Sequence, residues 1–173
     1  MSNKKKLVYN DSRRFGLFEI ADKGAVTENK WLKFLGPEPL DKKNFNSTYL
    51  FQGSRSRKVP VKAFIMDQKV VVGVGNIYAS EALFRAGLRP QIRANKLTQQ
   101  DAKQLVASVR TIISKAIKSG GTTIRDFAQT NGQKGYFARQ LKVYGRTGEP
   151  CFDCQTEICC QSIGGRTSFW CPH

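Results

Sequence analysis

Three cysteines near the end of the sequence have the spacing of a metal site. Cys151 and Cys154 form a Cys-x-x-Cys pair, and Cys171 follows after the 16 residues 155–170. Thiolates at such a spacing on a short hairpin are typical zinc ligands, and a structural zinc ion takes four of them. The spacing predicts one structural Zn²⁺ in preference to a segment without metal.

The sequence leaves the fourth ligand of this site open. His173 lies two residues after Cys171, which makes an awkward bite on one ion. Cys159 and Cys160 are alternatives, but we expect them to be ordinary buried thiols. All five cysteines follow residue 150, whereas a secreted disulfide framework would spread them along the chain.

A glycine-rich segment, Gly73-Val74-Gly75-Asn76, precedes a helical pattern and has the composition of an anion site. The first N–H groups of a helix have no partner within the helix and carry the positive end of its dipole, so they bind phosphate readily. The alternative is a tight turn in which Asn76 acts only as the N-cap.

Basic and aromatic residues in two further places suit contact with nucleic acid. Arg166 follows two glycines within the expected hairpin loop, where a guanidinium can fork onto a phosphate. Phe15 follows Arg13 and Arg14, and it is either a core residue or an apolar wedge that enters a base stack.

The charge of the whole chain supports a polyanionic partner. Its 29 Lys and Arg residues against 13 Asp and Glu residues give a net charge of +16. The alternative is a surface tuned for solubility. An anionic membrane would need a basic amphipathic helix, and we find no convincing one in the sequence. No run of about 18 apolar residues and no signal peptide is present, so the cytosol is the expected location.

The elements that must position these residues are mainly helical. Residues 7–20 suggest two strands joined by a turn at 10–12, and short helices are expected at 31–35 and 45–52. The central pattern predicts helices from Pro60, from Asn76 to Gly87, and from a Thr98–Asp101 capping sequence to Gly120. The apolar face expected on the last of these consists of Leu105, Val109, Ile112, Ile113, Ala116 and Ile117. The cysteine-bearing end reads as a small hairpin.

Five stretches are long and distinctive: YNDSRRFG at 9–16, LGPEPL at 35–40, MDQKVVVGVGNIYASE at 66–81, GGTT at 120–123 and VYGRTGEPC at 143–151. Together they resemble the bacterial formamidopyrimidine-DNA glycosylases, relatives of endonuclease VIII. The resemblance implies a remnant of an N-terminal β-sandwich at 1–25, a helix–two-turns–helix domain with a lesion-recognition loop at 26–135, and a zinc-finger β-hairpin at 136–173.

The same resemblance implies a function in DNA repair. Members of the formamidopyrimidine-DNA glycosylase family excise oxidised purines such as 8-oxoguanine and formamidopyrimidines from double-stranded DNA, and they cleave the abasic strand by β,δ-elimination. It implies that Lys62, Asn76 and Arg166 bind phosphates near the lesion, and that Cys151, Cys154 and Cys171 bind zinc. A monomer without membrane contact is expected.

Further roles follow from the resemblance for two loops. Arg13 would face the orphaned cytosine, with Arg14 beside it on the DNA and Phe15 as a wedge. The lesion loop would enclose the extruded base through the carbonyl of Thr122 and the amides of Ile124, Arg125, Asp126 and Phe127.

The start of the sequence departs from this family. Its nucleophile is an N-terminal proline followed by a glutamate, whereas this chain begins Met1-Ser2-Asn3. No residue of this chain therefore matches the catalytic pair, and we expect no base excision by the chain alone. The alternative hypotheses are a stand-alone damaged-DNA binding module without chemistry and a general zinc-containing nucleic-acid-binding protein.

Overall fold

The computed structural model describes residues 8–9, 16–20, 22, 24, 28–122 and 136–173. The chain divides into two compact units, residues 1–33 and 34–173. The boundaries expected at residues 25 and 135 stay predictions. In the described part of the first unit, no residue lies in a strand, and the turn expected at 10–12 lies outside the described residues.

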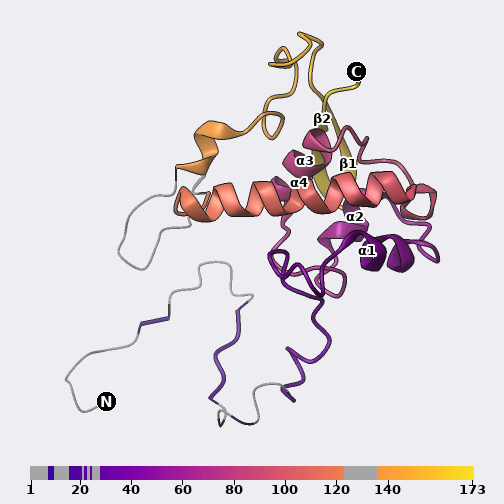
Figure 1. The fold of residues 1–173 in the computed structure, drawn as a ribbon. Helices are drawn as coiled ribbons and strands as arrows, with labels where there is room; N and C mark the ends of the chain where they lie inside the picture. Colours follow the sequence, from indigo (N-terminus) through magenta and orange to yellow (C-terminus); the bar gives the residue numbers. More distant parts are fainter. Residues whose placement is uncertain (1–7, 10–15, 21, 23, 25–27, 123–135) are drawn as a thin grey trace. The chain divides into compact units, whose positions relative to one another are not determined.

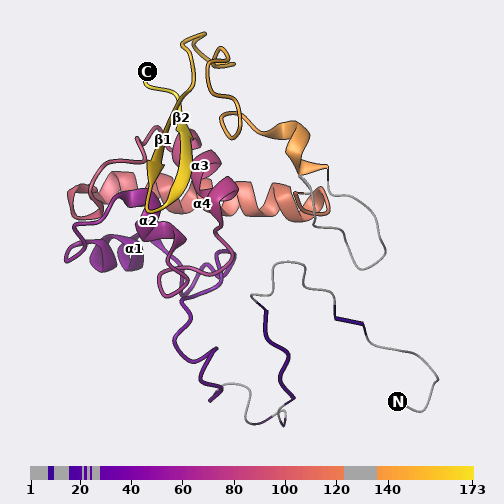
Figure 2. The same cartoon turned by 180° about the vertical axis from the view of Figure 1, so that it is seen from behind.

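The second unit contains four α-helices and one hairpin among its described residues (Figures 1 and 2). The elements in chain order are α1 (Ser47–Ser54), α2 (Val61–Met66), α3 (Asn76–Arg85), a 3₁₀ turn (Ala94–Lys96), α4 (Gln99–Lys118), a second 3₁₀ turn (Phe137–Gln140), β1 (Cys159–Ile163) and β2 (Arg166–Trp170). The mainly helical fold with a C-terminal hairpin is confirmed.

The long helix α4 is the scaffold on which the other helices pack. Thr98 and Asp101 form a capping box, in which the Asp101 N–H donates to Thr98 Oγ1 at 3.0 Å and the Thr98 N–H donates to Asp101 Oδ2 at 2.8 Å. One face of α4 is buried against α1 and α3. Ile117 was expected on this face but is 62 % exposed, because it is rotated about 100° from its buried neighbour Ala116.

Of the two short helices expected before residue 60, one is absent and the other begins later than expected. Residues 31–34 form turns rather than a helix, and the Leu32 and Lys33 N–H groups both donate to the Asn29 carbonyl. The helix expected at 45–52 is α1, which begins two residues later because the Asn46 side chain caps it through the Tyr49 N–H at 2.9 Å.

Residue 36, shortly after these turns, must be a glycine because two stretches of backbone approach closely there. A Cβ at Gly36 would lie 2.6 Å from the backbone carbon of Val70, so only glycine allows the two stretches of backbone to approach. The Gly36 N–H donates to the Gln68 carbonyl at 2.7 Å. This contact joins the segment before α1 to the turn that leads into α3.

The hairpin β1–β2 packs on the helical core beside α3 (Figures 1 and 2). Gly164 and Gly165 make its turn with φ values of 59° and 74°, and Arg166 begins β2. A second, small apolar cluster of Val143, Cys151 and Ile158 lies under the cysteine-bearing loop, and Phe84 of α3 packs against it. The hairpin is thereby joined to the helical domain.

Candidate nucleic-acid interface and metal centre

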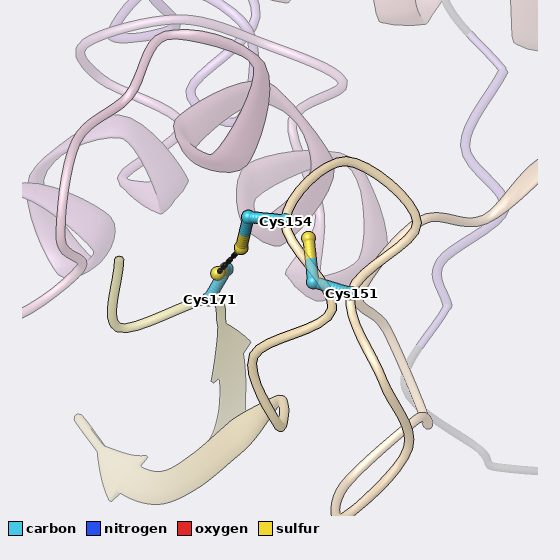
Figure 3. A group of neighbouring side chains, drawn as sticks. All are labelled: Cys151, Cys154 and Cys171. Carbon is cyan, nitrogen blue, oxygen red and sulfur yellow. Dashed lines mark hydrogen bonds between the residues drawn. The ribbon is translucent and has the colours of Figure 1, made fainter.

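The three cysteines of the expected metal site converge in the structure (Figure 3). Their Sγ atoms all lie within 4.8 Å of one another, and Cys154 Sγ is 3.4 Å from Cys171 Sγ. Zinc–sulfur bonds of about 2.3 Å in a tetrahedral site place sulfur atoms about 3.8 Å apart. The trio therefore has the dimensions of a metal site.

The backbone around the first two cysteines forms a tight knuckle. The Cys151 N–H donates to the Thr156 carbonyl at 2.8 Å, and the Gln155 N–H donates to the Cys151 carbonyl at 2.9 Å. Hydrogen bonds from Thr156 lower the pKa of the Cys154 thiol to about 7, whereas burial raises the pKa of Cys171 to about 11. Cys154 thus forms the thiolate that a metal ion binds more readily than Cys171 does.

The other cysteines lie apart from this trio. Cys159 is half-buried, and Cys160 is exposed on β1. The expectation that both are buried thiols is wrong for Cys160, because alternate residues of a strand face opposite sides and the outer face of this hairpin is open to solvent. Within the described part of the chain, the group that can hold a metal comprises only Cys151, Cys154 and Cys171.

The second site is built around Lys62, which is only 1 % exposed. Its ammonium donates to Asn76 Oδ1 at 2.6 Å, to Ser168 Oγ at 2.7 Å and to the Thr167 carbonyl at 3.2 Å. These three bonds use every N–H of the ammonium. A direct bond from Lys62 to a phosphate would require one of them to break.

Two charges interact at this site. Burial of the ammonium, with the nearby Arg166 charge as the second cause, lowers the pKa of Lys62 to about 8. Arg166 itself is exposed at the start of β2. The buried cation thus lies beneath an exposed one.

The sequence suggested that Asn76 caps α3, but the N-cap residue in the structure is Gly75. The reason is that the Asn76 side chain is engaged elsewhere, since it accepts from Lys62 and its Nδ2 donates to the Thr167 carbonyl at 3.1 Å. A Cβ at Gly75 would meet nothing within 4 Å, so the approach to the helix start is open. The site combines the first N–H groups of α3, one amide and one guanidinium.

The remaining predicted site residues are only partly described. Thr122 Oγ1 and Tyr78 Oη are 3.1 Å apart, and Thr122 forms an isolated bridge with Tyr136 that closes the base of the expected lesion loop. The loop residues Ile124, Arg125, Asp126 and Phe127 lie outside the described residues, as do Arg13, Arg14 and Phe15.

Sequence reasoning missed Glu81 as a structural residue. Its carboxylate is buried and accepts from the N–H groups of Lys142, Val143 and Tyr144 at 2.9, 3.0 and 2.9 Å. These bonds fix the segment that leads from the helical core to the knuckle. An acidic residue within the apolar run from Ala79 to Leu83 was the available signal, because a buried carboxylate requires donors.

Comparison with known proteins identifies the family. A family model described as the formamidopyrimidine-DNA glycosylase H2TH domain matches residues 35–128, which include α1 to α4. The chain belongs to the formamidopyrimidine-DNA glycosylase family. The resemblance read from the five sequence stretches is confirmed.

Curated relatives extend this family likeness to nearly the whole chain. The formamidopyrimidine-DNA glycosylase of Histophilus somni (strain 129Pt) is 49 % identical over 172 residues, which are 99 % of this chain and 63 % of the relative. That of Bdellovibrio bacteriovorus is 47 % identical over 166 residues, 96 % of this chain and 60 % of the relative. The chain thus spans somewhat over half the length of these glycosylases.

Solved structures of the same family share the fold. The MutM (Fpg) protein of Thermus thermophilus gives a TM-score of 0.84 at 39 % identity and covers 94 % of this chain and 61 % of that one. Lactococcus lactis Fpg in complex with DNA containing an abasic site gives 0.85 at 34 % identity, with coverage of 94 % and 59 %. Across the described residues, no helix has the length and apolar character needed to span a bilayer.

Proposed function

We propose that this chain binds double-stranded DNA that contains an oxidised base or an abasic site, as the DNA-holding part of a glycosylase. The observation that carries the proposal is the network in which Lys62 joins Asn76, at the start of α3, to Thr167 and Ser168 of the hairpin. It brings an open helix N-terminus and the exposed Arg166 to one site. Such donors suit phosphate groups.

Each residue of this site has a distinct proposed role. Asn76 and the first N–H groups of α3 bind one backbone phosphate, and Arg166 binds a phosphate through its guanidinium. Lys62, being buried, acts behind them: it orients the Asn76 amide and fixes the hairpin on α3. These contacts position the duplex without reading its bases.

The lesion itself is the proposed target of two loops. The segment from Thr122 through Ile124, Arg125, Asp126 and Phe127 encloses the extruded base, and the bond between Thr122 and Tyr78 fixes one end of it. Arg13, Arg14 and Phe15 fill the space that the base leaves. The family likeness supports these roles.

We propose that the ion held by Cys151, Cys154 and Cys171 is zinc. The donor set of three thiolates at these distances suits Zn²⁺. A bound structural zinc ion supplies folding free energy to a hairpin that has only a small apolar cluster of its own. The thiolates orient β2 and thereby Arg166.

The reaction proposed for the full activity is that of the family. It comprises excision of 8-oxoguanine or formamidopyrimidine and cleavage of the abasic strand by β,δ-elimination. For the residues of this chain we propose binding and positioning of the lesion DNA, and none of them is proposed as the nucleophile. We propose that the protein acts as a monomer in the bacterial cytoplasm, where its DNA lies.

The test is binding of a labelled duplex, measured by fluorescence anisotropy. Asn76→Ala is expected to cost about 1–3 kcal/mol of binding free energy, and equally so for lesion and undamaged duplexes, because a phosphate contact does not depend on the base. A loss confined to the lesion duplex would contradict the proposed phosphate contact.

A further inference from the structure

A cavity of about 580 Å³ lies at the opposite end of α3 from Asn76. It is lined by residues from the C-terminal parts of α3 and α4, from the second 3₁₀ turn and the two residues after it, and from the cysteine knuckle. Ten residues of helix separate the two ends of α3 by about 15 Å. The cavity is therefore distinct from the site at Asn76 and Arg166.

Four cations line this cavity: Arg85, Lys115, Arg139 and Lys142. All four are exposed, and among the described residues the one ion pair is that of Arg146 with Glu149. Of the two acidic residues in the lining, Glu81 is engaged by three backbone N–H groups, which leaves Asp153. The cavity thus carries an excess of positive charge.

Helix dipoles account for part of this charge and not for the rest. Arg85 and Lys115 lie in the last turns of α3 and α4, where cations offset the negative helix ends. Arg139 and Lys142 belong to no α-helix. Each of these two cations lies near an aromatic ring, Arg139 at 5.4 Å from the Tyr136 centroid and Lys142 at 4.8 Å from the Phe152 centroid. An anionic ligand would offset the repulsion among the four charges that line this cavity.

An exposed aromatic ring stands at the edge of the cavity. Phe152 is 57 % exposed, the Arg146 guanidinium lies 3.6 Å from its centroid, and the Lys142 ammonium lies 4.8 Å from it. Arg146 is itself fixed by Glu149 at 2.8 Å and by the carbonyls of Lys142 and Pro150 at 2.6 and 2.9 Å. The Arg146 contact covers part of the Phe152 ring and fixes it, and the exposed remainder is available for stacking.

We propose that this cavity binds a nucleotide, with its phosphate on the four cations and its base against Phe152. Base stacking on aromatic side chains beside a basic surface is the general mode by which proteins bind single nucleotides of a strand. The volume lies within the range of small-ligand pockets. Free nucleotides and the end of a single strand share this chemistry.

The test is an amide-resolved NMR titration of the full chain with dAMP and, separately, with a short 5′-phosphorylated oligothymidylate. Shifts are expected at Phe84, Lys142 and Asp153 with either probe, and they should be smaller at Asn76 and Thr167. If only the oligonucleotide causes them, the ligand is a strand end; if both do, the free nucleotide suffices.

The matched variants carry the same loss of charge. Arg85→Gln/Lys115→Gln should weaken dAMP binding about tenfold, whereas Lys42→Gln/Lys103→Gln, which removes two exposed charges elsewhere, should leave it unchanged. Phe152→Leu should weaken dAMP binding more than it weakens binding of inorganic phosphate. Thermal unfolding of each variant verifies the fold.

Several outcomes would overturn the proposal. They are equal binding of inorganic phosphate and dAMP, equal losses in both double variants, and shifts at these amides only with an acidic peptide. Because Asn76→Ala is expected to leave these shifts intact, failure here is separable from failure of the proposed DNA site.

Discussion

The two ends of α3 use positive charge in opposite ways. At the N-terminal end, Lys62 is buried and its ammonium group donates three hydrogen bonds, so the position of its charge is fixed. At the C-terminal end, Arg85 and Lys142 are exposed and free of ion pairs with other described residues. The buried cation determines geometry, whereas the exposed ones attract ligands and are screened by salt.

The largest effect should come from the metal site, because the hairpin and its knuckle contribute to both ends of α3. A two-stranded hairpin is marginal by itself, so Cys154→Ser or chelation should disorder it and weaken duplex binding by more than about tenfold. Amide NMR spectra and anisotropy measure the two losses. Cys160→Ser, at an exposed position outside the trio, is the matched control and should behave as wild type.

Replacement of Lys62 should disrupt the site at the N-terminal end of α3 without affecting the cavity at its C-terminal end. Lys62→Met removes the donor to the buried Ser168 Oγ and to Asn76 Oδ1, which is half-buried. A buried acceptor without a donor costs about 1–3 kcal/mol. We expect a fall of about 2–4 kcal/mol in the free energy of unfolding, measured by urea denaturation. Lys58→Met, four residues away and exposed, should change it by less than about 0.5 kcal/mol. Equal effects of the two variants would contradict the positioning role.

The pH dependence of stability should sharpen the same comparison. The pKa of Lys62 is about 8 in the folded protein against 10.5 normally, so the unfolded state binds more protons between these values. The free energy of unfolding should therefore rise with pH in this window, by on the order of 1 kcal/mol from Lys62. The difference between wild type and Lys62→Met isolates this contribution. A difference that falls or stays constant would show that Lys62 keeps its proton.

Local signals in the sequence were sufficient for α4 and for the group of three cysteines, but not for the helix expected at 31–35. The Thr98–Asp101 capping box and the apolar spacing along α4 depend on neighbours a few residues apart, and both were predicted correctly. The cysteine spacing predicted the trio in the same way. Ile117 was assigned to the buried face of α4 but is exposed, because a step of one residue along a helix rotates the side chain by about 100°.

The surroundings of Lys62 and Asn76, at the proposed phosphate site, could not be predicted from the sequence. Lys62 contacts Thr167 and Ser168, more than a hundred residues later, and no local pattern indicates that pairing. For the same reason Asn76 was expected to cap its own helix, whereas distant partners hold its side chain. Burial of a lysine is a tertiary property, and it changes the role that we propose for Lys62 from direct phosphate contact to positioning.

The most direct test of the central claim is the salt dependence of duplex binding. For the wild-type chain, the logarithm of the association constant should fall against the logarithm of salt concentration with a slope on the order of −4 to −8. Arg166→Gln should reduce the magnitude of this slope by about 1, whereas Asn76→Ala should weaken binding and leave the slope unchanged, because Asn76 carries no charge. A wild-type slope near zero, or an unchanged slope in Arg166→Gln, would contradict the assignment of this site to DNA phosphates.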